Sequence, residues 1–259
     1  MTRTVLLHSL LTLSLSLLLV VPSMAGAAEL KVFCTHALTP ALEQLKADFE
    51  SKTGNKLVII DSTSIAAAKR IQAGEAGDVA ILTDSVNKDL VKQGKLDPKS
   101  VKDIAVTGIS VAVKAGAPKP DISTVEAFKK TLLAAKSIAY SDPAAGGYSG
   151  IVAARGIQRL GLTDQLKSKT TMVGGGGAVG PLAADGRVEL AIQMESELKA
   201  TKGVDIVGPL PGDLQDLTLF SAAVMTGSKN AAGAEKLIKL FKSKKAIPVL
   251  KATGMQMPK

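Results

Sequence analysis

Residues Glu29 to Leu82 read ELKVFCTHALTPALEQLKADFESKTGNKLVIIDSTSIAAAKRIQAGEAGDVAIL. This stretch contains three short runs rich in β-branched and apolar residues, and the segments between them carry apolar residues at helical spacing. The pattern predicts strands at Glu29–Cys34, Lys56–Ile60 and Val79–Leu82, with a helix in each gap. Strands that alternate with helices form a parallel sheet covered by helices, so the stretch predicts an α/β unit.

The first helix has recognisable ends. Thr39 is expected as its N-cap, Pro40 as its first helical residue, and Gly54 as the residue that stops it. Its apolar stripe is Leu42, Leu45 and Phe49. The second helix is expected from Ser64 to about Ala73.

Two longer β-rich segments interrupt the alternation, at Asp103–Lys114 and Leu217–Thr226, and a second strand and helix series lies between them. We interpret both segments as hinge strands between two lobes. The expected fold is therefore α/β and two-lobed, with two wound mixed sheets joined by hinge strands and the ligand between the lobes. Lobe 1 would hold residues 28–108 and 212–259, and lobe 2 residues 109–211.

The N-terminus has the order of a secretory signal peptide: Arg3, an apolar run from Val5 to Val21, and small residues up to Ala28. We expect cleavage after Ala25 or Ala27, which makes residues 1–27 the signal peptide. The apolar run is shorter than the roughly 20 residues that span a bilayer, and no small-residue lipobox precedes Cys34. The mature protein is therefore predicted to be periplasmic, without a stable membrane anchor, and monomeric.

The formal charge of the chain is +9, and removal of residues 1–27 takes away Arg3 and no acidic residue. The lysines are scattered, and no aromatic residues interleave with them to stack on bases, so we expect no nucleic-acid partner. The charge is interpreted as a solvated surface that also steers anions. The single cysteine excludes a disulfide within the chain.

The candidate chemistry lies in four polar or glycine-rich turns that each lead from a strand into a helix. Such turns expose unpaired backbone N–H groups at the positive end of a helix dipole, where anions bind. Ligands of wound α/β sheets collect beyond the carboxyl ends of the strands. The four turns are Thr35–Thr39, Ser62–Ser64, Gly146–Gly150 and Gly174–Gly180.

The mature sequence resembles the periplasmic molybdate-binding family of ABC importers over nearly its whole length. The matching stretches are Val32–Leu42, Ser62–Ile81, Ser141–Pro143 and Gly150–Gly161. The resemblance implies a Venus-flytrap protein that closes on a small anionic ligand and delivers it to an ABC permease.

The resemblance also implies where a ligand would bind. The family's first serine falls on Ala37, its second on Ser64, a backbone position on Ser149, and its tyrosine on Met194. Only Ser64 keeps its hydroxyl, which weighs against molybdate and tungstate but leaves an anion cleft. Arg155 is a possible carboxylate partner if it reaches the cleft. The candidate ligand-binding residues are Thr35, His36, Ser62, Ser64, Tyr148, Ser149, Gly176 and Met194.

An enzyme remains the alternative, because some proteins that resemble this family are periplasmic isomerases of aconitate. Such an enzyme would move an allylic proton, with His36 or Tyr148 as the acid or base. Ser64, Ser149 and the glycine turn Gly174–Gly180 would hold the carboxylates. His36 has no partners at metal-ligand spacing, so neither a metal nor a cofactor is expected. A dinucleotide fingerprint also fits Gly175, Gly177 and Gly180, but we favour a tight glycine turn there.

Overall fold

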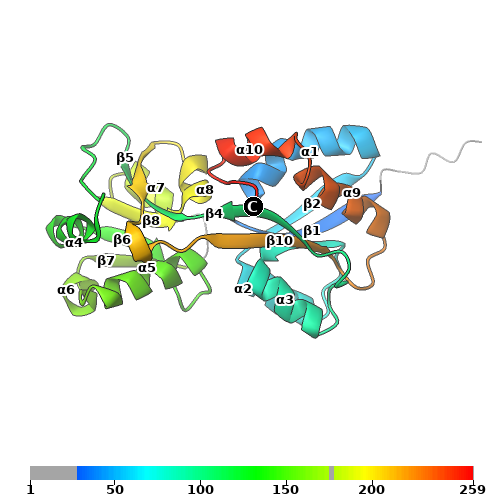
Figure 1. The fold of residues 1–259 in the computed structure, drawn as a ribbon, viewed down its shortest axis with the longest axis horizontal. Coiled ribbons are helices and arrows are strands. Elements are labelled where there is room, and N and C mark those ends of the chain that lie inside the picture. Colours follow the sequence, from blue (N-terminus) through cyan, green and yellow to red (C-terminus); the bar gives the residue numbers. More distant parts are fainter. Residues whose placement is uncertain (1–27, 175–177, 259) are drawn as a thin grey trace, which may run out of the picture.

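The computed structural model describes residues 28–174 and 178–258 of the chain. The protein has two lobes, each built on a five-stranded sheet with helices packed around it (Figure 1). The predicted signal peptide, residues 1–27, lies outside the described residues. Within the described ranges, no helix combines the length and the apolar composition that a membrane crossing requires.

Lobe 1 contains the sheet with the strand order β2-β1-β3-β10-β4. Its first three strands in chain order run parallel, and β10 runs antiparallel to both of its neighbours. The elements of this lobe are β1 (Glu29–Thr35), α1 (Thr39–Thr53), β2 (Lys56–Ser62), α2 (Ser64–Gln72), β3 (Val79–Thr83), α3 (Asp84–Lys92), β4 (Lys102–Thr107), β10 (Thr218–Val224), α9 (Ala231–Phe241) and α10 (Ala246–Ala252).

Lobe 2 contains the second sheet, with the strand order β7-β6-β8-β5-β9. Here β6, β7 and β8 run parallel, and β5 runs antiparallel to β8 and β9. The elements are β5 (Ile109–Lys114), α4 (Val125–Ala134), β6 (Ile138–Ser141), α5 (Tyr148–Arg159), α6 (Thr163–Lys167), β7 (Thr170–Val173), α7 (Val179–Ala184), β8 (Leu190–Met194), α8 (Glu195–Ala200), β9 (Val204–Pro209) and a 3-10 turn at Gly212–Leu214.

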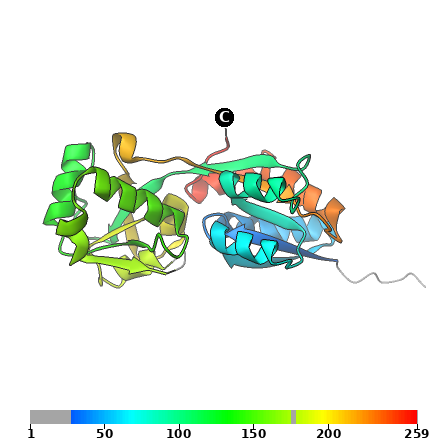
Figure 2. The same ribbon diagram turned by 90° about the horizontal axis from the view of Figure 1, so that it is seen from below.

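The chain crosses between the lobes twice. The first crossing is at Gly108, between β4 and β5, and the second lies between β9 and β10. After the first crossing the chain enters β5, which runs antiparallel to its neighbours in the sheet of lobe 2. After the second crossing it enters β10, which runs antiparallel to its neighbours in the sheet of lobe 1. The predicted β-rich segment Asp103–Lys114 is therefore two strands in different sheets. Both connections lie on the same side of the molecule (Figure 2).

The second connection contacts lobe 2 along most of its length. The side-chain amide of Gln215 accepts from the Ile109 N–H at 2.8 Å and donates to the Ile109 carbonyl at 2.9 Å. Leu214 is buried, and one of its methyl groups lies against Gly156 of α5. The lobe boundary expected at residue 212 stays a prediction, and these contacts favour a boundary nearer Leu217.

The local sequence explains how α1 and α2 begin and end. Gly54 ends α1 in the left-handed conformation, at φ 69°, as predicted. The predicted N-cap of α1 is wrong, because Leu38 occupies that position and the Thr39 hydroxyl donates to Asp61 instead. Helix α2 begins at Ser64 as predicted, and the Thr63 hydroxyl caps it by accepting from the Ala66 N–H at 3.1 Å.

Candidate functional site

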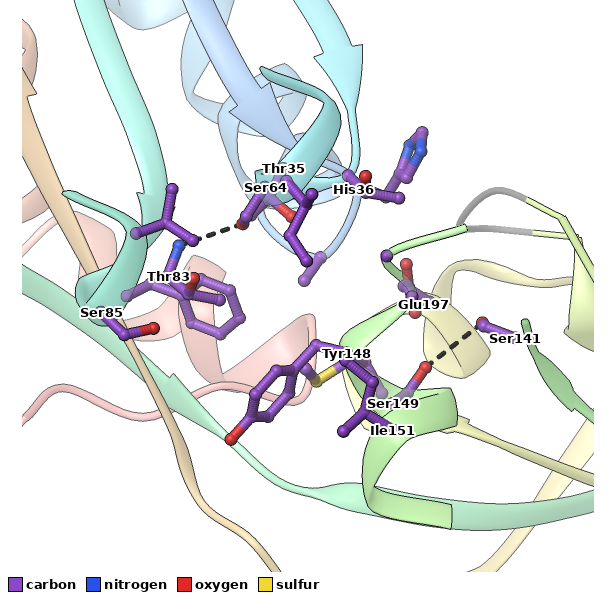
Figure 3. A pocket seen from close by; sticks show the side chains of 18 residues that line it. Thr35, His36, Ser64, Thr83, Ser85, Ser141, Tyr148, Ser149, Ile151 and Glu197 are labelled. Atoms are coloured by element: carbon purple, nitrogen blue, oxygen red, sulfur yellow. Dashed lines mark hydrogen bonds between the residues drawn. The ribbon is translucent and has the colours of Figure 1, made fainter. Parts of the chain in front are cut away.

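A cavity of about 240 Å³ lies between the two lobes (Figure 3). Lobe 1 contributes the ends of its parallel strands β1, β2 and β3, and lobe 2 contributes the ends of β6 and β8. The carboxyl ends of parallel strands meet at one edge of a sheet, which brings these distant segments together. The lining residues are Thr35, His36, Ala37, Thr63, Ser64, Ile65, Thr83, Ser85, Val86 and Phe220 of lobe 1, and Ser141, Gly146, Gly147, Tyr148, Ser149, Ile151, Met194 and Glu197 of lobe 2.

On the lobe 1 side, Ser64 is held in place by the strand beside it. Its hydroxyl oxygen accepts from the Thr83 N–H at 3.1 Å, in a buried hydrogen bond. Because that bond uses only a lone pair, the hydroxyl hydrogen of Ser64 can still be donated to a ligand. Thr35 ends β1 nearby and is also buried.

On the lobe 2 side, the N-terminus of α5 lines the cavity through Tyr148 and Ser149. The first N–H groups of a helix have no partner within the helix, so this end offers backbone donors to an anion. The buried Ser149 hydroxyl lies 3.3 Å from the Ser141 hydroxyl. Helix α5 approaches β6 so closely that a Cβ on Gly150 would lie 1.6 Å from the Ser141 carbonyl oxygen, so glycine is needed there.

Tyr148 and Arg155 both contact Asp216 in the connection between β9 and β10. The Tyr148 hydroxyl donates to the Asp216 carboxylate at 3.3 Å, and Arg155 pairs with the same carboxylate at 2.6 Å. Burial, followed by the charge of Asp216, raises the pKa of the Tyr148 phenol. Tyr148 therefore lines the cavity with its hydroxyl engaged, and Arg155 is not among the lining residues.

His36 is part of a small polar cluster in lobe 1. Its Nδ1 lies 2.8 Å from Oδ2 of Asp61, and the Thr39 hydroxyl donates to Oδ1 of the same carboxylate at 2.6 Å. The hydrogen bond with Asp61 raises the pKa of His36 above its ordinary value, although burial opposes the shift. His36 also lines an adjoining, more open hollow together with Thr39, Asp61 and Glu197.

Glu197 is a buried carboxyl on the lobe 2 side of the cavity, with 8% of its surface exposed. Burial raises its pKa to about 7, although the nearby His36 opposes the shift. In Figure 3 it lies between His36 and the Ser141–Ser149 pair. Glu197 is not among the predicted ligand-binding residues. Its position in the first turn of α8, directly after the strand that the sequence predicts at Val188–Gln193, was an available signal.

The structure brings six of the eight predicted ligand-binding residues to the cavity: Thr35, His36, Ser64, Tyr148, Ser149 and Met194. Ser62 is not among the lining residues, and its hydroxyl donates to the Thr63 carbonyl at 3.3 Å. Gly176 lies outside the described residues. Ala37 and Met194 are both buried in the lining, and neither can donate a hydrogen bond through its side chain.

No group of three or more metal-ligating side chains occurs among residues 28–174 and 178–258. What the cavity offers instead is hydroxyls, a helix N-terminus and two ionisable groups, His36 and Glu197, whose pKa values are both raised. This set can bind a small anion and exchange protons with it.

Comparison with known proteins identifies the relatives of this fold and site. Residues 30–256 match the family model described as bacterial extracellular solute-binding protein. The chain is 34% identical over 254 residues to an aconitate isomerase of Pseudomonas sp., covering 95% of both proteins. It is 26% identical to the molybdate-binding protein ModA of Escherichia coli (strain K12), covering 81% of this chain and 82% of that one.

A solved structure shows the same fold. The periplasmic molybdate-binding protein of Azotobacter vinelandii superposes with a TM-score of 0.75 at 24% identity, covering 89% of this chain and all of the other. The predicted two-lobed binding-protein fold and the resemblance to molybdate-binding proteins are both confirmed. This chain belongs to the bacterial extracellular solute-binding protein family.

Proposed function

We propose that this protein captures a small carboxylate anion between its lobes. The observation that carries the proposal is the cavity itself, where Ser64, Ser149 and the N-terminus of α5 offer donors from both lobes. A cavity of about 240 Å³ is small for a drug-sized ligand and suits a compact polar one. Hydroxyl and backbone N–H donors spread over two walls fit several carboxylate groups at once.

The lining favours a carboxylate over a metal oxyanion. The positions where the resemblance implies a serine and a tyrosine hold Ala37 and Met194, and both lie in the lining. Neither side chain donates, so a tetrahedral oxyanion would lose two of its donors here. The relative named aconitate isomerase, at 34% identity, supports a tricarboxylate as the ligand.

Thermal unfolding of the mature chain with a panel of anions tests this proposal. A ligand at about 100 times its dissociation constant adds about 2.7 kcal/mol to the free energy of unfolding, which raises the midpoint by about 5–10 °C in a chain of this size. We expect the shift with citrate, both aconitates or propane-1,2,3-tricarboxylate. A shift confined to molybdate and tungstate would make the protein a metal-oxyanion receptor instead.

The cellular role that follows is an exported, monomeric receptor that delivers its ligand to an ABC permease. Support comes from the signal-peptide pattern of residues 1–27 and from two solved structures of the same fold. One is described as a periplasmic molybdate-binding protein, and the other as the substrate binding domain of a putative molybdenum ABC transporter. Fractionation of cells followed by N-terminal mass spectrometry checks the export step. A chain that begins after Ala25 or Ala27 in the periplasmic fraction is expected, and an intact Met1 there would contradict it.

Isomerisation of aconitate is the second candidate function. The observation that favours it is that His36, paired with Asp61, and Glu197 approach the same cavity from opposite lobes. A base would remove a proton from the CH₂ carbon, the double bond would shift by one carbon, and a proton would return to the former vinyl CH. This proton shift interconverts cis- and trans-aconitate with no other reactant.

Ultraviolet absorbance after mixing with trans-aconitate separates the two functions, since a receptor leaves the spectrum unchanged. If the chain is an isomerase that uses His36, His36→Ala abolishes turnover, whereas Arg155→Lys, which alters a residue outside the lining, does not. Unchanged turnover in His36→Ala would remove His36 from the mechanism.

A further inference from the structure

The proposed anion site contains a carboxyl group, which raises the question of how the two coexist. Glu197 lines the cavity, is almost fully buried, and comes from the wall opposite Ser64. None of the described residues that line the cavity is a lysine or an arginine. A charged Glu197 would therefore repel an entering carboxylate, and His36 is the one ionisable side chain among the described lining residues that can offset it.

The charged groups around Glu197 belong to both lobes. His36 attracts its carboxylate and Asp61 repels it, and both face it from lobe 1. On its own helix, Glu195 and Lys199 pair with each other at 3.0 Å. Lys202 and Asp185 line the adjoining hollow with it. Helix α8 also packs against α1, β5, β8 and β9, whose charged residues are Glu43, Lys46, Asp48, Glu50, Lys52, Lys114 and Asp205.

Several of these groups already have partners away from Glu197. Asp48 pairs with Lys52 and Lys245, Glu50 accepts from the Leu57 N–H, and Asp205 accepts from the Gly116 N–H. His36 and Asp61 are the groups whose charge acts on Glu197. They form one hydrogen-bonded pair, so the attraction from His36 is partly cancelled.

We infer that Glu197 is a ligand-binding residue that works in its protonated form, donating its carboxyl hydrogen to the bound carboxylate, so that capture of the anion takes up a proton. This inference rests on the proposed anion-binding function. A neutral carboxyl is a hydrogen-bond donor, whereas a carboxylate can only accept. A bound anion beside Glu197 disfavours its charged form still further, which is the cause of the uptake.

The protonation of Glu197 sets the direction in which the affinity for the anion changes with pH. Burial raises the pKa of Glu197 in the free protein to about 7, and an adjacent anion raises it further. Below about pH 6 the residue is already protonated and affinity is level. Above about pH 7 binding must add the proton, so affinity falls by up to about tenfold per pH unit. Loss of the His36 charge acts in the same direction, so variants must separate the two.

Isothermal titration calorimetry with propane-1,2,3-tricarboxylate is the test. This saturated analogue of aconitate has no double bond to shift, so it measures binding even if the protein is an isomerase. Titrations at about pH 8 in buffers of different ionisation enthalpy give the number of protons taken up. For the wild-type protein we expect net uptake and an affinity about tenfold weaker at pH 8 than at pH 6.

Glu197→Gln keeps a neutral donor of the same shape, so we expect it to bind within about threefold of wild type at pH 6. At pH 8 it should take up about one proton fewer and bind more tightly than wild type. Glu195→Gln is the matched control, because Glu195 lies on the same helix but does not line the cavity; it should retain the uptake. His36→Gln should retain the share of the proton uptake that is due to Glu197.

Equal proton uptake by wild type and Glu197→Gln would overturn the inference, and so would a wild-type affinity that is the same at pH 6 and pH 8. The wild-type titrations alone can overturn the inference even if a variant does not fold, because a pH-independent affinity excludes proton uptake. If neither the tricarboxylate nor any other anion of the panel binds, the proposed function is wrong and this inference is wrong with it. Binding without proton uptake would leave the function standing and remove only the role of Glu197.

Discussion

The imidazole of His36 is the only one in the chain beyond residue 27, which makes its titration directly observable. The hydrogen bond with Asp61 is the main reason that its pKa is raised, and burial works against it. A group whose pKa is raised by folding stabilises the folded state below its unfolded pKa of about 6.5, and this stabilisation is lost as the pH rises through the folded value.

Asp61→Asn should therefore lower the pKa of His36, because the carboxylate that favours the imidazolium is gone while burial remains. The stabilisation present below about pH 6.5 should disappear with it. Nuclear magnetic resonance of the single imidazole in the mature chain measures the first effect, and urea unfolding at two pH values measures the second. Asp213→Asn, an exposed aspartate of lobe 2 that pairs with Arg159, is the control and should leave the His36 pKa unchanged. An unchanged His36 pKa in Asp61→Asn would show that the hydrogen bond with Asp61 is not what raises it.

Individual site residues differ in how far the sequence could identify them. Ser64 and Ser149 lie where polar or glycine-rich turns lead from a strand into a helix, so the pattern that predicted those strands and helices also indicated these residues. Glu197 was harder to find, because it is 161 positions away from His36 in the sequence and approaches it only across the two lobes. Ser62 was predicted because it lies in the right turn, but its hydroxyl bonds to the neighbouring Thr63 carbonyl.

Among the elements, α5 has the most demanding contact with the sheet. A Cβ on Gly150 would lie 1.6 Å from the Ser141 carbonyl oxygen and 2.6 Å from its carbon, so the backbone would have to move. A Cβ on Gly156 of the same helix would meet only a methyl group of Leu214, at 3.8 Å. Glycine is therefore required at position 150 for the close approach of α5 to β6, and it is not required at position 156.

Gly150→Ala should cost more than about 2 kcal/mol of the free energy of unfolding, because the new methyl group overpacks against backbone. Gly156→Ala should stabilise by about 0.5–1 kcal/mol, since alanine restricts the unfolded chain and favours a helix interior. Urea denaturation of the mature variants measures both. A Gly150→Ala protein as stable as Gly156→Ala would show that α5 can move away from β6 without loss.

The elements themselves were predictable where hydrophobic periodicity was strong. The sequence pattern predicts terminal helices at Ala231–Phe241 and Ala246–Ala252, and these are the bounds of α9 and α10. The predicted strands β1 to β3 differ from the observed ones by one or two residues at their ends. Helix α3 was missed although Val86, Leu90 and Val91 recur at helical spacing and pack on the core of lobe 1. Strand β9 was missed because its residues are half-buried or exposed, so no run of buried positions marks it. The cap of α1 was wrong because a tertiary hydrogen bond to Asp61 outweighed a local preference.

In the molecule as a whole, the two lobes touch at the mouth of the cavity. Ile65 is the second residue of α2 in lobe 1, and a Cβ placed on Gly146 of lobe 2 would lie 3.0 Å from the Cβ of Ile65. Gly146 has a φ of 79°, so the absence of a side chain lets the lobe 2 turn both bend and approach Ile65. This contact joins the lobes only when they lie close together, as in a closed binding protein.

Ile65→Ala should therefore weaken ligand binding more than it weakens the fold. Ile65 is 38% exposed, so the free protein loses little, and we expect a change within about 0.5 kcal/mol in the free energy of unfolding. The closed, ligand-bound state loses apolar contact across the cavity mouth, which should raise the dissociation constant for propane-1,2,3-tricarboxylate by about fivefold to tenfold, or about 1–1.4 kcal/mol. Calorimetry measures the affinity, and small-angle X-ray scattering with and without ligand measures how far the lobes close.

Ile247→Ala is the matched control, because Ile247 is an isoleucine of similar exposure, 48%, on α10 and is not among the residues that line the cavity. Ile247→Ala should bind the ligand as tightly as wild type does, and it should become as compact as wild type when the ligand binds. Equal affinities for the two alanine variants would mean that the contact between Ile65 and Gly146 contributes nothing to closure. Ligand would then be held by the polar groups alone, and the two lobes would close without help from apolar contact at the mouth.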